Sequence, residues 1–205
     1  MAWAPDYITV AQLADYCKVT GDEDDPELAS AVTSASRAVD LETSRQFGLV
    51  AAVEPRYYTA HLDKRRWTWV IEIDDLMTTT GLLVAHDPND DDTFVDSITE
   101  YILEPRNAAA KGRPWERIIV RRGASTRPCG RTDAVRVTAR FGWTAVPDPI
   151  VEAVKLQGSR FFARRDSPYG VAGSPENSSE LRLLAKVDPD VAVALRGYRR
   201  WWGAR

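Results

Sequence analysis

The sequence predicts an α+β protein: a helical bundle made from N-terminal and C-terminal helices, with an inserted antiparallel β domain. Apolar residues recur at helical spacing near both ends of the chain. Between about residues 56 and 143 the apolar period changes to two, as in half-buried strands. The 205 residues, 44% of them hydrophobic, suffice for a packed core. We expect N-terminal helices over residues 1–50, a β module over 51–145, and C-terminal helices with a docking tail over 146–205.

The first two helices have recognisable starts. Thr9 and Gln12 have the spacing of a capping box, with Ile8 and Leu13 placed as its hydrophobic staple, and this helix should run to about Val19. Asp25-Pro26 opens the second helix, because Asp can cap free N–H groups and Pro is tolerated in the first turn. Its apolar stripe comprises Leu28, Val32, Ala35 and Val39, and Gly48 is the expected stop.

Alternating patterns predict the strands of the β module. The segment Trp67–Ile73 alternates at its odd positions, and Ala134–Phe141 alternates apolar residues with Arg and Thr. Shorter candidates separated by turn-rich stretches are Tyr57–Leu62, Gly81–Ala85, Tyr101–Leu103 and Arg117–Arg121.

Two further Asp-Pro pairs predict the C-terminal helices. Asp148-Pro149 opens a helix that should end around residues 164–166. Asp188-Pro189 opens a last helix, which would place Val191, Leu195, Tyr198 and Trp202 on one face, with Arg196, Arg199 and Arg200 around them.

The charge is unevenly distributed. Residues 150–205 carry ten Lys/Arg and six Asp/Glu, a net charge of +4, so the overall charge of −3 leaves −7 on residues 1–149. The overall balance argues against a dedicated nucleic-acid binder. A basic tail suggests an acidic partner surface, but on the charge alone ordinary solvated charge is the preferred interpretation.

The residues that usually carry chemistry form no recognised motif, so we expect neither an enzyme nor a cofactor. His61, His86, Cys17 and Cys129 lack metal-ligand spacing, and no phosphate-loop, dinucleotide-binding, hydrolase or metalloprotease signature occurs. Ser125 has no histidine near it in sequence, although a base could come from elsewhere in the fold. Neither a signal peptide nor a membrane helix is expected.

Two acidic runs could be mistaken for metal sites. Asp87, Asn89 and Asp91 mimic the first ligands of a calcium loop, but Asp92 stands where glycine is needed and Ile98 where a bidentate glutamate is needed. A solvated hairpin loop is the preferred interpretation. The run over residues 22–25 sits at a helix start, where negative charge is favoured, so capping is preferred there.

Aromatic residues point to docking. The chain has seven tryptophans and seven tyrosines, and Trp201-Trp202 lies beside arginines near the C-terminus. Trp, Tyr and Arg often dominate protein interfaces. The predicted docking residues are Leu195, Tyr198, Arg199, Arg200, Trp201 and Trp202. For Leu195 and Tyr198, packing within the chain's own bundle is an equal alternative.

A series of segments in a particular order resembles a known family. In chain order they are Tyr7–Tyr16, Ala31–Gly48, Tyr57–His61, Ile73–Gly81, Pro105–Ala108, Gly112–Trp115, Val137–Trp143 with Val146-Pro147, Phe161–Gly170, and Asp188–Val191 with Tyr198–Arg200. Together they resemble the head–tail connector (adaptor) proteins of tailed bacteriophages, especially the longer versions from phages of actinobacteria.

This resemblance implies a virion structural protein of the neck, made in the host cytoplasm. It implies a homo-oligomeric ring, a dodecamer, beneath the portal protein. The ring would extend the channel for genomic DNA, without sequence recognition, and receive the next connector, stopper or tail protein. Portal contact falls on Leu195, Tyr198, Arg199 and Arg200, whereas Trp201 and Trp202 lie beyond the matching motif. The alternatives are a stopper-type or tail-completion protein of the same particle, or a β module that binds a metal or small ligand.

Overall fold

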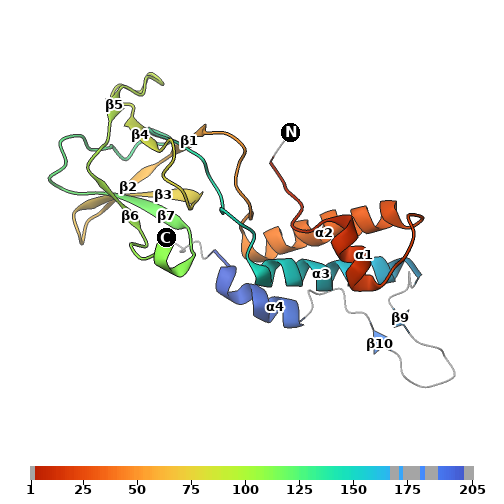
Figure 1. Cartoon of the computed structure of the whole chain (residues 1–205). Helices are drawn as coiled ribbons and strands as arrows, with labels where there is room; N and C mark the ends of the chain where they lie inside the picture. Colours follow the sequence, from red (N-terminus) through yellow and green to blue (C-terminus); the bar gives the residue numbers. More distant parts are fainter. Residues whose placement is uncertain (1–2, 167–170, 173–180, 183–188, 201–205) are drawn as a thin grey trace. The chain divides into compact units, whose positions relative to one another are not determined.

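The computed structural model describes residues 3–166, 171–172, 181–182 and 189–200. The fold is α+β, as predicted: N-terminal and C-terminal helices pack together, and two four-stranded antiparallel sheets lie between them in the sequence. The chain forms two compact units (Figure 1). The helical unit comprises residues 1–47 and 146–205, and the β unit comprises residues 48–145. Among the described residues, no helix is long and apolar enough to cross a membrane.

The first helix, α1 (Val10–Cys17), begins as the sequence predicts. The Thr9 hydroxyl accepts a hydrogen bond from the Gln12 backbone N–H at 3.2 Å, and the Gln12 side chain accepts one from the Thr9 N–H at 2.8 Å. Both halves of the capping box are therefore formed.

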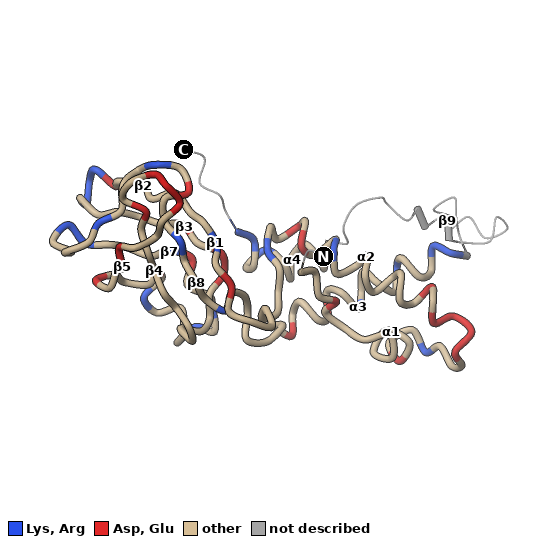
Figure 2. Tube along the Cα trace, turned by 90° about the horizontal axis from the view of Figure 1, so that it is seen from above, with Lys and Arg blue, Asp and Glu red and all other residues tan. Residues whose placement is uncertain are grey.

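The second helix, α2 (Asp25–Thr43), starts where predicted but ends earlier. Ser44 adopts the left-handed conformation with φ of 52°, and its N–H donates to the Asp40 carbonyl. Gly48 is therefore not the stop. At the other end the Asp24 side chain makes no capping hydrogen bond, and its carboxylate forms an ion pair with Arg165. Figure 2 shows the acidic run to which Asp24 belongs, in the loop between α1 and α2.

The third helix, α3 (Asp148–Ala163), continues as a 3₁₀ turn, η2 (Arg164–Asp166), as expected for its end. It lies against both α1 and α2. A Cβ added at Gly158 would lie 3.2 Å from Leu13 Cδ1 and 3.7 Å from Ala35 Cβ. The absence of a side chain at Gly158 thus lets three helices approach closely.

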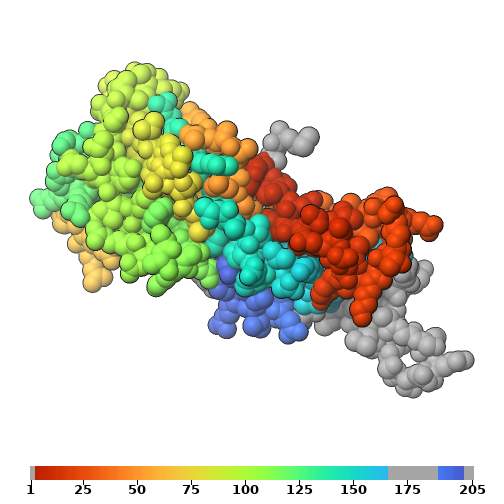
Figure 3. All heavy atoms as spheres, viewed as in Figure 1, coloured from red at the N-terminus to blue at the C-terminus, as the bar shows by residue number. Residues whose placement is uncertain are grey.

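The last helix is shorter than predicted. It runs over α4 (Pro189–Leu195) and becomes a 3₁₀ turn, η4 (Arg196–Tyr198), after which Arg199 is extended. The expected single helical face from Val191 therefore stops before Arg199, and its last member, Trp202, lies outside the described residues. Val191 and Leu195 are both buried, as that face requires. Figure 3 shows α4 (blue) lying against α3 (teal). A short pair of strands, β9 (Val171–Ala172) and β10 (Leu181–Arg182), precedes α4.

The β unit consists of two antiparallel sheets. The first has the order β1 (Glu54–Tyr58), β8 (Val135–Ala139), β4 (Leu83–His86) and β5 (Asp96–Ser97). The second has the order β2 (Ala60–Asp63), β3 (Thr68–Leu76), β7 (Trp115–Val120) and β6 (Tyr101–Glu104). A 3₁₀ turn, η1 (Ala109–Lys111), lies between β6 and β7.

The alternation predicted for the long strands is confirmed in β8, where Val135, Val137 and Ala139 are buried and the residues between them are half-exposed. In β3, Ile71 and Ile73 are buried as expected. The single strand predicted over Tyr57–Leu62 is instead two strands, because the chain passes from β1 in one sheet to β2 in the other at Thr59.

The segment Phe141-Gly-Trp143, which follows β8, connects the two sheets of the β unit through β3. Gly142 has φ of +108°, and a Cβ there would lie 2.1 Å from the Gly48 carbonyl oxygen, so only glycine fits. The Trp143 side chain is 1% exposed, and its Nε1–H donates to the Asp75 carboxylate at 2.7 Å. A buried indole N–H is thereby satisfied by a buried acid.

Candidate docking surfaces

The C-terminal segment is anchored by α4. Leu195 is fully buried and Val191 is 1% exposed, and α4 packs against α3 and α2. Of the predicted docking residues, Leu195 is therefore part of the core of its own unit. Val193 lies on the opposite face of α4 and is 74% exposed. Val193 was not among the predicted docking residues, although its helical spacing from Val191 and Leu195 signals the outer face.

The residues after α4 run along the C-terminal end of α2. The Tyr198 ring meets Phe47 edge-on at 5.9 Å between centroids, and the Tyr198 carbonyl accepts a hydrogen bond from Arg45 Nε at 2.7 Å. Arg199 forms an ion pair with Glu42. The Arg200 N–H donates to the carbonyl of Thr43, one of the carbonyls that a helix end leaves unpaired.

The structure thus brings Leu195, Tyr198, Arg199 and Arg200 together at one edge of the helical unit. Their contacts fix the direction of the chain as far as Arg200. Trp201 and Trp202, the remaining predicted docking residues, lie outside the described part of the chain.

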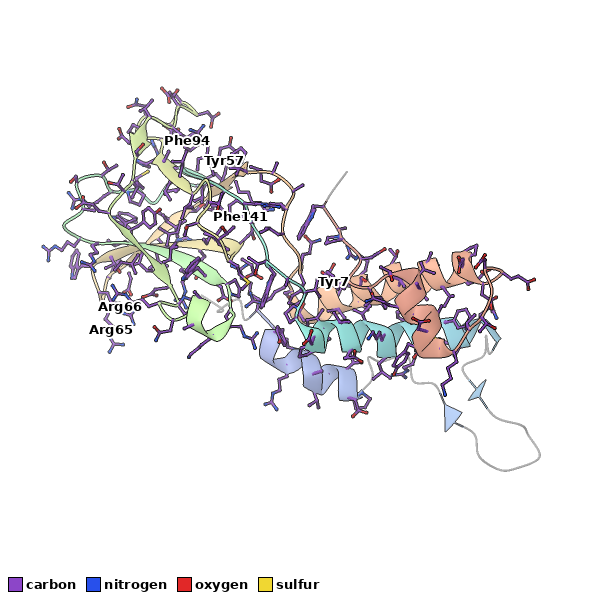
Figure 4. All side chains as sticks on the ribbon, in the orientation of Figure 1. Tyr7, Tyr57, Arg65, Arg66, Phe94 and Phe141 are labelled. Atoms are coloured by element: carbon purple, nitrogen blue, oxygen red, sulfur yellow. The ribbon has the colours of Figure 1, made fainter. Side chains whose placement is uncertain are left out.

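A second exposed surface covers the outer face of the sheet that contains β1, β8 and β4. Tyr57 and Leu83 are 52% and 67% exposed. The Tyr57 and Phe94 rings lie 5.4 Å apart, and the Arg136 guanidinium lies over the Phe94 ring at 4.9 Å (Figure 4). Apolar and aromatic residues around an arginine are typical of interface centres.

Strand pairing assembles this outer face. Tyr57 and Ala85 both pair with Arg136, and Leu83 pairs with Thr138. A groove of about 320 Å³ is lined by Leu83, Phe94, Arg136 and their neighbours. No local pattern in the sequence signals this surface, because the register of three strands distant in sequence creates it.

In the loop that resembles a calcium site, the first acid, Asp87, is bonded to the backbone of the loop itself. The Asp87 carboxylate accepts hydrogen bonds from the backbone N–H groups of Asn89, Asp90, Asp91 and Asp92 at 3.0–3.1 Å. Burial would raise the pKa of Asp87, but these amide donors hold it below its ordinary value. The preferred interpretation, a hairpin loop between β4 and β5, accounts for these contacts.

His86 and Cys129 form the nearest approach to a catalytic pair. His86 Nε2 lies 3.3 Å from Cys129 Sγ and accepts the Cys129 backbone N–H at 3.2 Å. Burial and the nearby Arg131 lower the pKa of His86, which favours the neutral ring. Because its Nε2 lone pair is already engaged by the amide, the pair ties a loop to β4 and lacks the free base that thiol activation needs. Among the described residues, no group of three or more His, Cys, Asp or Glu side chains could hold a metal ion.

Comparison with known proteins gives matches in solved structures. No family model matches the sequence, and no curated protein is detectably similar. A chain from a structure described as the neck of an empty GTA (gene transfer agent) particle, computed with C6 symmetry, has a TM-score of 0.55 and 21% identity. A chain from the neck of a native GTA particle, computed with C12 symmetry, has a TM-score of 0.51 and 21% identity. Each match covers 100% of this chain and 97% of the other. At this identity the likeness shows a shared fold over the whole length.

Proposed function

We propose that this chain is a non-enzymatic structural protein of the neck of a phage-like particle, and that it is the adaptor ring beneath the portal. The main support is the fold, which matches GTA neck chains over 100% of this chain in both units. The ordered segments that resemble phage adaptors support the same role. In this role the protein forms a homo-oligomeric ring around the DNA channel, binds the portal protein on one side and receives the next neck or tail protein on the other.

The C-terminal segment is the proposed portal contact. Tyr198, Arg199 and Arg200 are held against the end of α2, so residues 201–205 start from a fixed point. Trp201 and Trp202 would supply the aromatic anchors that dominate many interfaces. Leu195 acts indirectly in this proposal, because its burial holds α4 in place.

The experiment replaces Trp201 and Trp202 by alanine and measures binding to the purified portal of the same particle. We expect binding to weaken by more than about tenfold, because two aromatic anchors are removed. The thermal unfolding temperature should not change, since the contacts of Tyr198 to Arg200 remain. Deleting residues 188–205 would be a poorer test, because it also removes buried Val191 and Leu195 from the core.

Trp67→Ala is the matched control. Trp67 is a 55% exposed tryptophan of the β unit, and its replacement should leave portal binding unchanged. Wild-type affinity of the double variant for the portal would refute the C-terminal contact.

The outer face of the β1–β8–β4 sheet is the proposed contact with a neighbouring copy. A ring needs two different complementary surfaces on each protomer. An exposed face with Tyr57, Leu83 and Phe94 around one arginine has the composition of such a surface. A metal-binding or ligand-binding role for the β unit has less support, because Asp87 is occupied by backbone amides.

A further inference from the structure

Positive charge gathers at one end of the β unit. The turn between β2 and β3 consists of Lys64, Arg65, Arg66 and Trp67, and Figure 4 shows Arg65 and Arg66 at its tip, pointing away from the sheet. The end of β7 lies beside this turn, because Trp69 of β3 pairs with Val120. The chain then continues into Arg121 and Arg122.

A cation–π contact confirms that the β2–β3 turn lies beside the segment after β7. The Arg122 guanidinium lies over the Trp67 ring at 5.4 Å from its centroid. Arg127 lies close by, since its NH1 group donates to the Arg122 carbonyl at 3.4 Å. We name the exposed cations of this end the basic tip: Lys64, Arg65, Arg66, Arg121, Arg122 and Arg127.

Neighbouring acids do little to neutralise the basic tip. The Asp63 carboxylate accepts the backbone N–H groups of Arg65 and Arg66, and its ion pair with the Arg66 side chain is long, at 3.9 Å. The Glu100 carboxylate is bonded to the N–H and hydroxyl of Ser125. The six cations of the basic tip therefore outnumber Asp63 and Glu100, whose carboxylates already accept hydrogen bonds from the loops.

The charge of the basic tip differs sharply from the net charge of the β unit and of the whole chain. The β unit, residues 48–145, has 14 Lys/Arg and 14 Asp/Glu, and is neutral as a whole. Residues 1–47 have three Lys/Arg and nine Asp/Glu, a net charge of −6. The acidity assigned to residues 1–149 thus lies almost wholly before the β unit, and an overall charge of −3 conceals the basic tip.

We propose that the basic tip binds the phosphate backbone of duplex DNA without reading its sequence. Guanidinium groups match phosphate geometry with paired donors, and sequence-independent binding arises from such contacts. An acidic protein partner is a poorer fit, since an interface centre surrounds an arginine with apolar and aromatic residues, whereas the basic tip sets six cations beside the Trp67 ring. Stacking of single-stranded bases is also disfavoured, because Arg122 lies over the Trp67 ring.

This inference rests on the proposed neck function, in which DNA passes through the ring. Contacts to phosphates that lack sequence preference are compatible with passage, because they can slide along the duplex. The basic tip would touch the duplex at successive positions around a ring, while the acidic first 47 residues would repel it.

The test measures binding of the full chain to a short mixed-sequence duplex by fluorescence anisotropy, at several salt concentrations. Replacing Lys64, Arg65 and Arg66 by glutamine should weaken binding at low salt by at least tenfold. The slope of log K against log salt should also become shallower, by about 0.9 for each phosphate that the variant no longer neutralises.

The matched control variant changes Arg106, Lys111 and Arg117 to glutamine. These are exposed cations of the same unit towards the opposite end of β7, and the change in net charge is identical. The control should retain wild-type affinity for the duplex. Equal reductions in affinity for both variants would show a general charge effect and overturn the proposal.

Three other outcomes would also overturn it. The first is no salt-dependent binding of wild type to the duplex, and the second is tighter binding to single-stranded DNA. The third is tighter binding to polyglutamate, which would indicate an acidic protein partner. Portal binding separates this inference from the proposed adaptor function: a chain that binds the portal but not DNA refutes only the basic tip, and a chain that binds DNA but not the portal refutes only the adaptor role.

Discussion

At the residue scale, Tyr7 ties the N-terminal segment to α2 and to the residues that follow it. Its side chain is buried beside α2 (Figure 4), where its hydroxyl donates to the Asp40 carboxylate and accepts the Phe47 N–H at 2.9 Å. The Tyr7 and Phe47 rings meet edge-on at 5.6 Å. One phenol therefore satisfies a backbone donor in the segment that leads from α2 towards the β unit.

Burial and the hydrogen bond to Asp40 raise the pKa of Tyr7, and they outweigh the Phe47 N–H, which lowers it. Burial is the largest cause, and the hydrogen bond to Asp40 adds to it, so the folded protein holds the phenol proton more tightly than the unfolded chain does. Because the unfolded chain loses this proton near pH 10, the contribution of Tyr7 to stability is full below that pH. It is lost as pH rises further.

We predict that Tyr7→Phe lowers the free energy of unfolding by about 1–3 kcal/mol at pH 8, because the Phe47 N–H loses its acceptor. The difference between wild type and variant should shrink as pH rises above about 10, since only wild type has a phenol at residue 7 to ionise. Urea unfolding of both proteins at a series of pH values measures this difference. Tyr16→Phe, at a 45% exposed position, is the control and should change the free energy of unfolding at pH 8 by less than about 0.5 kcal/mol. A difference in free energy of unfolding between wild type and Tyr7→Phe that stays constant from pH 8 to about pH 11 would contradict the argument.

At the element scale, α4 is an anchor. Its seven residues bury Val191 and Leu195 against the bundle and present Val193 to solvent. A helix this short is not stable by itself, so tertiary contacts must hold it. The direction of the proposed docking segment therefore depends on the packing of Leu195.

Leu195→Ala should lower the free energy of unfolding by about 2–5 kcal/mol, because it opens a cavity in a fully packed site. Val193→Ala on the same helix should change it by less than about 0.5 kcal/mol, since that side chain is 74% exposed. Denaturant unfolding followed by circular dichroism compares the two. Equal, small effects would mean that α4 is not docked as described.

Elements that are specified locally were predictable from the sequence. The capping box at Thr9 and the alternation in β8 each depend on residues within a few positions of one another, and both are confirmed. The end of α2 was not predictable, because a serine took the left-handed position where glycine was expected. The split of Tyr57–Leu62 into two strands depends on sheet partners far away in sequence.

The candidate surfaces also combine features that local sequence patterns predict with features that depend on residues distant in sequence. Tyr198, Arg199 and Arg200 could be found as an aromatic–basic run, but their contacts with the end of α2 could not. Long-range strand pairing builds the outer sheet face and brings the arginines that follow β7 to the β2–β3 turn. Local sequence patterns carry no information on such pairing.

At the scale of the whole molecule, the proposed neck function can take two forms: an adaptor that binds the portal directly, or a stopper that binds a neck protein already in place. The aromatic–basic C-terminus favours the adaptor. We therefore predict that the purified chain binds purified portal rings when no other neck protein is present. Electron microscopy of the complex should show a ring of this chain that follows the symmetry of the portal. Trp201→Ala/Trp202→Ala should leave bare portals, whereas Val193→Ala tests whether the outer face of α4 also contributes. Binding that appears only after another neck protein is added would assign the chain to the stopper position.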